Sequence, residues 1–191
     1  MNADSPMKHF HGVWIGLTIY TALRAAALAD TRTFPPVADA TIFNFFGCPP
    51  APNGECGSGL GDRLYFGDTV SFGERRALLR FDLTSIPAGS TVTGATLSLT
   101  LVRARDDNST VSVRRILQPW SEGPSTFTRG SGVPALPGDV TWLTRTFAAT
   151  PAQPWITPGG DFVPTISSSQ IVGGVVFPVL SVPYAFVGPQ L

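Results

Sequence analysis

Tryptophan side chains are the first candidates for binding chemistry in this chain. Trp120, Trp142 and Trp155 are spread over the second half of the sequence. A flat aromatic ring can pack on the C–H face of a sugar and loses little side-chain entropy when it does so. Trp155 lies in a proline-rich segment, AQPWITP, and loops of this kind often carry functional residues. We interpret all three as candidate ligand contacts, with Trp155 first, although burial in the core is the alternative for each.

Arginine side chains are the second group of candidates. Arg80, Arg103 and Arg114 lie on or next to segments that we expect to be strands, and they could share one sheet face. The guanidinium group binds a carboxylate through two parallel hydrogen bonds, so such a face would suit an acidic polysaccharide such as a uronate polymer. The alternative is a solvated face on which Asp82 and Glu74 are the partners, because exposed ion pairs are common and weak.

Aspartates are scattered through the expected turns, and calcium prefers carboxylates and carbonyl oxygens in such loops. Asp39 and Asp68 are the candidates for a structural calcium site. The chain has no DxDxDG spacing, which would be the specific signal. We therefore expect no cofactor, with a structural calcium ion at these two aspartates as the alternative.

The N-terminus is typical of a secretory signal peptide over residues 1–29. A basic edge precedes the apolar run VWIGLTIYTAL, and the sequence ALA at 27–29 fits a small-x-small cleavage site. The apolar run is shorter than the ~20 residues that a membrane span needs, so we expect cleavage, with a retained anchor as the alternative. The mature protein would then be secreted or attached to the cell surface, without a membrane span.

Signal cleavage would also limit the available chemistry. Lys8 is the only lysine, and His9 and His11 are the only histidines. Without them the mature chain can form no Ser-His-Asp or Cys-His triad, no histidine metal centre and no Schiff-base lysine. The sequence therefore excludes these classes of enzyme.

A glycan-cleaving enzyme remains a third functional class. Hydrolysis would need two opposed carboxylates, for which Glu122 with Asp139 or Asp161 are the candidates. A lyase could use Tyr65 with Arg80. Nothing in the spacing favours either pair, so we expect no enzymatic activity.

The cysteines indicate the redox compartment of the protein, and its net charge limits the class of partner. Cys48 and Cys56 flank the segment PPAPNGE, and in an exported protein we expect them to form a disulfide. A redox pair is the alternative, but the CxxC spacing is missing. The formal net charge is zero, so the chain lacks the basic surface of a nucleic-acid-binding protein.

Composition and periodicity predict the elements that must position these side chains. The 191 residues include 20 glycines and 18 prolines, which favours short strands joined by turns. Ala77, Leu79, Phe81 and Leu83 alternate with other residues and give one wholly apolar face, and residues 95–101 alternate in the same way. The sequence therefore predicts an all-β antiparallel sandwich of jelly-roll type. Its other expected strands are 37–46, 63–67, 111–116 and 140–147.

A series of motifs within residues 37–165 resembles the secreted bacterial DNRLRE-type domain. In order along the chain, these motifs are ADAT, RLYFG, LLRFDL, IPAG, ATLSL and VSVRRILQPW. That family is similar to disaggregatase-associated repeats and to an alginate-binding carbohydrate module family. The resemblance implies a β-sandwich in an extracellular protein with a non-catalytic, carbohydrate-binding or adhesive role. It also matches Trp120 to the tryptophan of the family pattern.

The resemblance ends before the chain does. We expect a sandwich domain over 30–174, and we interpret the apolar, proline-broken residues 175–191 as a tail of the kind that truncation or a frame shift leaves. The function that we expect is a secreted, non-catalytic carbohydrate-binding module whose partner is an extracellular polysaccharide, acidic by the arginine argument. The alternative is a structural or adhesive cell-surface domain with no small ligand.

Overall fold

The computed structural model describes residues 30–44, 48, 55–69, 73–104, 108–127, 130–173 and 182–188. The chain separates into two units, Met1–Thr33 and Phe34–Leu191. The predicted signal segment, residues 1–29, lies outside the described residues. Of the first unit only residues 30–33 are described, and there Nε of Arg32 lies 3.0 Å from a carboxylate oxygen of Asp30. All of the strands belong to the second unit.

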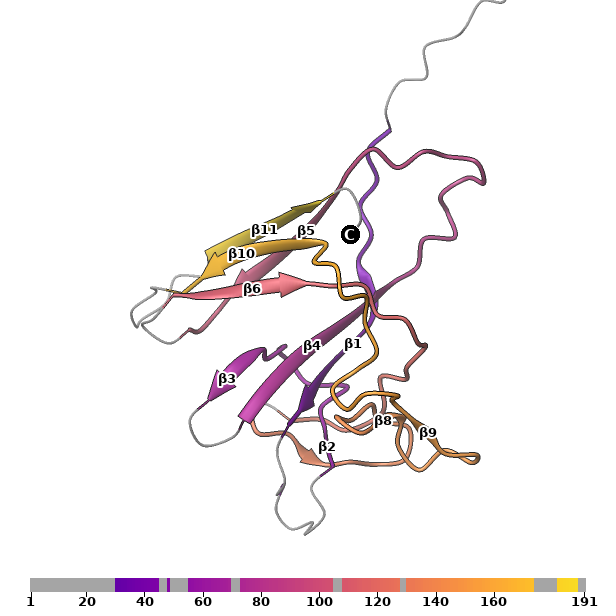
Figure 1. Ribbon diagram of the computed structural model, residues 1–191, viewed down its shortest axis with the longest axis vertical. Coiled ribbons are helices and arrows are strands. Elements are labelled where there is room, and N and C mark those ends of the chain that lie inside the picture. The colour runs from indigo at the N-terminus through magenta and orange to yellow at the C-terminus, as the bar shows by residue number, and fades with distance from the viewer. Residues whose placement is uncertain are drawn as a thin grey trace, which may run out of the picture. The chain divides into compact units, whose positions relative to one another are not determined.

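Every regular element among the described residues is a β-strand, and every strand pairing there is antiparallel. The prediction of an all-β antiparallel fold is confirmed, and the layers in Figure 1 are consistent with a β-sandwich. The finer prediction, jelly-roll topology, stays a prediction. No helix in the described part of the chain is long and apolar enough to cross a membrane.

The first sheet contains three strands in the order β1-β4-β3. They are β1 (Pro36–Phe43), β4 (Gly73–Phe81) and β3 (Gly67–Thr69). The β1–β4 register places Ala40 opposite Leu78, with an irregularity between Pro36 and Ala38. Because residues opposite each other share a sheet face, this register decides which side chains meet across the strands.

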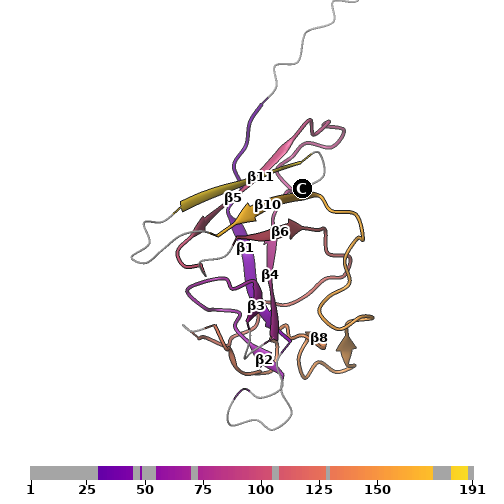
Figure 2. The same cartoon turned by 60° about the vertical axis from the view of Figure 1, so that its left-hand side comes forward.

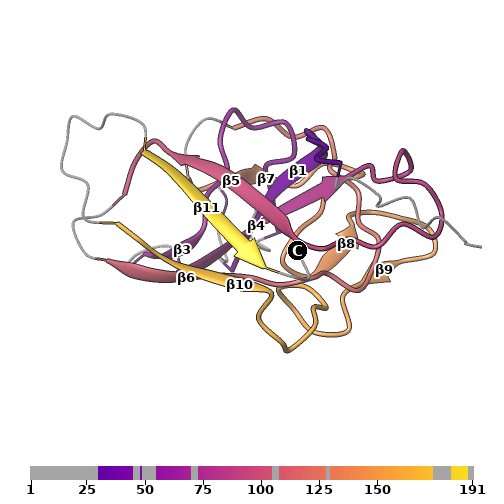
Figure 3. The same cartoon turned by 90° about the horizontal axis from the view of Figure 1, so that it is seen from above.

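The second layer is built from two strand pairs. β5 (Ala95–Leu101) pairs with β11 (Val182–Gly188), and β6 (Ser109–Val113) pairs with β10 (Ser168–Val172). The two pairs lie side by side through β11 and β10, as Figures 1 and 3 show. The Ser168 hydroxyl donates a hydrogen bond of 3.0 Å to the Val187 carbonyl and links them.

Two short pairs support the loops beneath the first sheet. β2 (Cys56–Gly57) pairs with β7 (Val133–Pro134), and β8 (Thr144–Thr146) pairs with β9 (Gln153–Pro154). The predicted Cys48–Cys56 disulfide is confirmed, with the two Cα atoms 5.9 Å apart and neither side chain exposed. It ties Cys56 of β2 to Cys48, and both cysteines pack with Phe43 of β1 in a small buried cluster.

Among the described residues, the larger buried cluster lies on one face of the first sheet. Ala38, Ala40 and Ile42 of β1 and Leu78 of β4 pack there against Trp120, Val140 and Trp155 from the long loops. Figure 2 shows these loops beside the β1–β4 pair. The main core is therefore formed between a sheet and loops.

The predicted apolar face of β4 is not this core face. Leu78 is 8% exposed, whereas Leu83 is 51% exposed and Ala77, Leu79 and Phe81 are only half-buried. The prediction was wrong in its choice of face because alternation with period two identifies two faces but not the one that distant loops will cover.

The C-terminal segment also differs from the expectation. Residues 182–188, predicted to be part of a tail outside the domain, form β11 and pair with β5 along its whole length. The prolines in this segment hid its strand character in the sequence, because proline is rare inside strands. Smaller differences concern 63–67, where a strand begins only at Gly67, and 140–147, where only Thr144–Thr146 is a strand.

Candidate functional site

The structure places Trp155 and Trp120 in the core. Each is 4% exposed, and the Trp155 indole donates a hydrogen bond of 2.9 Å to the Thr141 carbonyl. The expectation that Trp155 presents its ring from a loop surface is therefore corrected. The loop itself reaches the surface, since the next residue, Ile156, is 83% exposed. The Trp155 ring turns inward, where its N–H finds a hydrogen-bond acceptor.

Trp142 is half-buried and engaged by an arginine. The guanidinium carbon of Arg76 lies 4.7 Å from the centre of the Trp142 ring and 5.1 Å from that of Phe162, so two aromatic rings contact it. Arg76 also donates to the Gly159 carbonyl and to Glu74, both at 2.7 Å. This cluster fastens the 159–162 loop to β4 through cation–π contacts and hydrogen bonds.

The three arginines predicted to line one face do not come together. Arg80, on β4, donates to the Trp120 carbonyl at 2.8 Å and lies over its ring. Arg114 follows β6, stacks on Phe162 and donates to the Pro164 carbonyl. Arg103 follows β5, at the other end of the second layer from Arg114. Arg80 and Arg114 thus hold loops to strands instead of forming one carboxylate-binding face.

Two carboxylates that we considered for hydrolysis hold loop backbone in place. Asp139 is fully buried, and its oxygens accept the N–H groups of Ser125 at 3.1 Å and Leu136 at 2.7 Å. Asp161 accepts the N–H groups of Ile156 and Thr157 at 3.0 and 2.9 Å. Carboxylates of this kind shape loops by replacing water as acceptors for buried donors.

The proposed lyase pair is also separated. The Tyr65 N–H donates to Thr41 Oγ1, on the face of β1 that turns away from the core. Arg80 lies opposite Ala38 and so belongs to the other face. The first sheet therefore stands between the two residues.

The candidate calcium ligands lie on different strands. Asp39 is opposite Leu79 on one side of β4, and Asp68 is opposite Glu74 on its other side. They do not converge on one point. Among the described residues no three acidic, cysteine or histidine side chains are grouped so as to hold a metal ion.

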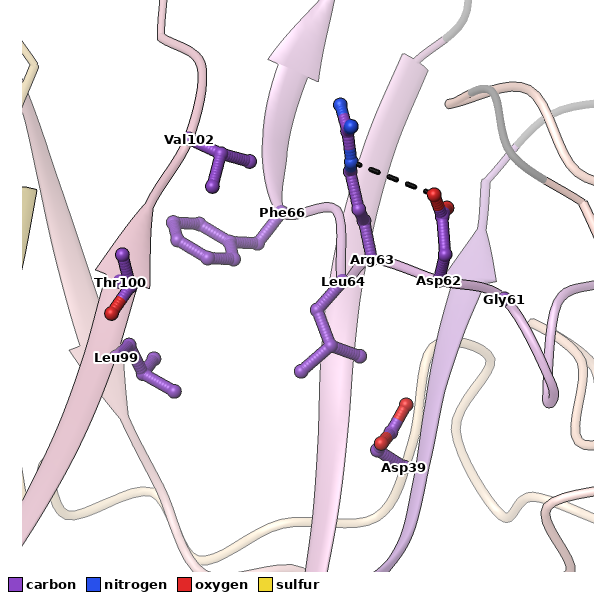
Figure 4. A pocket seen from close by; sticks show the side chains of 9 residues that line it. All are labelled: Asp39, Gly61, Asp62, Arg63, Leu64, Phe66, Leu99, Thr100 and Val102. Carbon is purple, nitrogen blue, oxygen red and sulfur yellow. Dashed lines mark ion pairs between the residues drawn. The ribbon is translucent and has the colours of Figure 1, made fainter. Parts of the chain in front are cut away.

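A cleft on the other side of the first sheet is the candidate site. It lies between that sheet and β5 and encloses about 300 Å³, at the lower end of the volumes of small-molecule sites. Figure 4 shows the side chains of its two walls. The lining residues are Asp39, Gly61, Asp62, Arg63, Leu64, Phe66, Leu99, Thr100 and Val102.

The walls of the cleft combine apolar and acidic groups. Leu64 and Phe66 come from the segment that leads into β3, and the Phe66 ring points across the cleft toward Val102 on the opposite wall (Figure 4). Asp39 and Asp62 add carboxylates at two separate places. Asp62 forms an exposed ion pair with Arg63 at 3.7 Å. An apolar surface with a few polar groups is the usual composition of a ligand site.

Glu122 gives Asp39 its particular environment. The Asp39 N–H donates to Glu122 Oε1 at 2.9 Å, which caps a backbone donor on the outer edge of β1. Burial, and then the nearby Glu122 carboxylate, raise the pKa of Asp39 above the usual value of an aspartate. No arginine among the described residues forms an ion pair with Asp39.

We expect Asp39→Asn to stabilise the protein near neutral pH. A raised folded-state pKa means that ionisation costs the folded state stability, and this cost grows as the pH rises through the folded pKa. Solvent screening limits the gain to a fraction of a kcal/mol. Urea denaturation of both proteins should show the difference at pH 7 and lose it at pH 3, where Asp39 is protonated in both states. An equal difference at both pH values would contradict the assignment.

Sequence reasoning missed the cleft. Phe66 lies in RLYFG, which we interpreted as a strand, and Asp39 was considered only as a calcium ligand. The cleft joins residues near 39, 61–66 and 99–102. The signal that could have found it is the segment GDRLYF before β3, in which two charged residues are followed directly by three large apolar ones that do not form a strand.

Comparison of the chain with protein-family models, with curated proteins and with solved structures gives no match. The assignment of a function therefore depends on the geometry and the chemistry of the cleft.

Proposed function

We propose that this protein is an exported, non-catalytic module that binds an extracellular glycan in the cleft between the first sheet and β5. The cleft itself carries the proposal, because it combines the Phe66 ring with the hydrogen-bonding groups of Asp39 and Thr100. A sugar offers a C–H face to an aromatic ring and hydroxyls to carboxylates, so it matches both parts of the lining.

Export is supported by two independent features. The Cys48–Cys56 pair forms a disulfide, which persists in oxidising compartments outside the cytosol. The sequence at 1–29 is typical of a cleavable signal. A polysaccharide at the cell surface or in the surrounding medium is the partner that this location makes accessible, and we propose no nucleic-acid partner.

A non-catalytic role is supported by where the carboxylates lie. Asp139 and Asp161 accept hydrogen bonds from loop backbone, while Asp39 lines the cleft with Glu122 next to it. A single aromatic platform and dispersed polar contacts are sufficient for binding. Hydrolysis of a glycan would need two opposed carboxylates, and the proposed binding role needs none.

Affinity electrophoresis of the folded protein against neutral and charged polysaccharides tests this function. We expect at least one polysaccharide to retard the protein. Phe66→Ala should weaken that binding about five- to tenfold, the usual worth of one aromatic stacking contact. Ile156→Ala is the matched control, because Ile156 is 83% exposed and lies outside the cleft, and it should bind as the wild type does.

Two results would contradict the proposal. Absence of retardation by any polysaccharide, with circular dichroism showing a folded β protein, would favour the structural or adhesive role. Equal weakening by Phe66→Ala and Ile156→Ala would remove the cleft as the binding site.

A further inference from the structure

The charge of the cleft selects among glycans. Of its nine lining residues, Asp39 and Asp62 are acidic and Arg63 is basic. Arg63 is already paired with Asp62 at 3.7 Å, which leaves Asp39 as the carboxylate without a cation. Glu122, whose Oε1 accepts the Asp39 N–H, adds a further negative charge behind it.

Three arginines outside the cleft do not offset its excess of negative charge. Arg76, Arg80 and Arg114 each donate to a loop carbonyl and lie over an aromatic ring. None of them lines the cleft. A uronate polymer in the cleft would bring its carboxylates toward Asp39, and among the described lining residues Arg63 is the one cation that could offset the repulsion. Like charges at short range disfavour binding.

We propose that the cleft recognises a glycan whose sugar units carry a free amine, such as a polymer of glucosamine. This inference rests on the proposed function and names the class of glycan. An ammonium group beside Asp39 supplies the cation that this half-buried carboxylate lacks, through a charge-assisted hydrogen bond. The Phe66 ring contacts either the sugar unit that carries this ammonium group or the adjacent sugar unit.

The separation of the two acidic residues also favours a polymer over a single cation. Figure 4 shows that the Asp39 and Asp62 carboxylates point to different places along the cleft. A chain with an amine on every unit presents a positive charge at intervals and can engage the two carboxylates together, with Asp62 exchanging its weak partner Arg63 for the ligand.

Two matched ligands test this inference. Oligosaccharides of glucosamine and of N-acetylglucosamine, of equal length, differ only at the nitrogen, which is a charged amine in one and a neutral acetamide in the other. Calorimetric titration just below neutral pH measures the binding of both. We expect the amine form to bind about tenfold more tightly, the worth of one charge-assisted hydrogen bond. Added salt should reduce this preference, because ions screen charges across the open cleft.

Asp39→Asn assigns the preference to one residue. We expect the variant to bind the two oligosaccharides within about twofold of each other. Asp82→Asn is the matched control, since Asp82 is exposed, lies outside the cleft and can still accept the Thr84 N–H through its amide oxygen. It loses the same charge and should keep the tenfold preference.

The outcomes separate this inference from the proposed function. Equal binding of both oligosaccharides, tighter binding of the acetylated form or preference for an oligogalacturonide overturns the amine selectivity and leaves glycan binding in place. An equal loss of preference in Asp39→Asn and Asp82→Asn also overturns it, because the effect would then be one of net charge. Binding of no glycan at all overturns the proposed function and the inference together.

Discussion

Trp155→Ala should lower the free energy of unfolding by about 3–5 kcal/mol, the cost of emptying a large aromatic site in a core. Trp155 is 4% exposed and packs with Ala38, Ala40 and Leu78 of the first sheet. The substitution also leaves the Thr141 carbonyl without its indole donor. Because small domains are typically stable by only about 5–15 kcal/mol, the loss would remove much of the total.

Urea denaturation followed by circular dichroism measures this loss. Trp155→Phe should lose less, since it keeps an aromatic ring in the core and removes only the N–H donor and part of the volume. Ile156→Ala, at the exposed neighbouring position, should change the free energy of unfolding little. A loss below about 1 kcal/mol for Trp155→Ala would mean that the ring is not buried as described, and its role as a ligand contact would return.

Asp139→Ala is the second substitution with a large expected effect. It removes the acceptor for two backbone N–H groups, those of Ser125 and Leu136, in a site with no exposed surface. Each buried donor left without a partner costs about 1–3 kcal/mol, so the two donors together predict a loss of about 2–6 kcal/mol. Gly57 and Gly123 pack so closely on this carboxylate that a Cβ on either would overlap it, which limits how the loops can rearrange.

Asp82→Ala is the control for this effect. Asp82 also accepts a backbone N–H, that of Thr84 at 2.9 Å, but it is exposed. Water can take its place, so thermal and urea denaturation should show a much smaller loss than for Asp139→Ala. Asp139→Asn should lie between the two, because its amide keeps one acceptor oxygen and turns its NH₂ toward the other N–H. Equal losses for Asp139→Ala and Asp82→Ala would refute the account.

These two residues show why side-chain type alone does not identify a functional residue. Tryptophan and aspartate serve binding and catalysis in many proteins, and the sequence offered both in loops. Within the described part of the chain, Trp155 and Asp139 instead hold long loops against the first sheet. A loop of this length must bury apolar side chains and satisfy its backbone donors if it is to stay in one conformation, and these residues meet both needs.

The alternation of apolar and polar residues was sufficient to predict a strand that pairs with its neighbour over its whole length. Residues 95–101 were predicted as a strand, and β5 has these bounds. The pattern in β4 was equally clear, but the core formed on the side of Leu78, Arg76 and Arg80. Arginine stems can cover apolar surface while their guanidinium groups reach aromatic rings and carbonyls, so charge in a strand does not mark an exposed face.

The sequence by itself determined the all-β class, the disulfide between Cys48 and Cys56 and the strand at 95–101, because alternation and cysteine spacing are local properties. Only the tertiary structure decided which face of β4 became the core, that Trp155 turns inward, and that Asp39 and Phe66 line a cleft with β5. Those outcomes depend on contacts between residues far apart in the chain, whose packing no local pattern specifies.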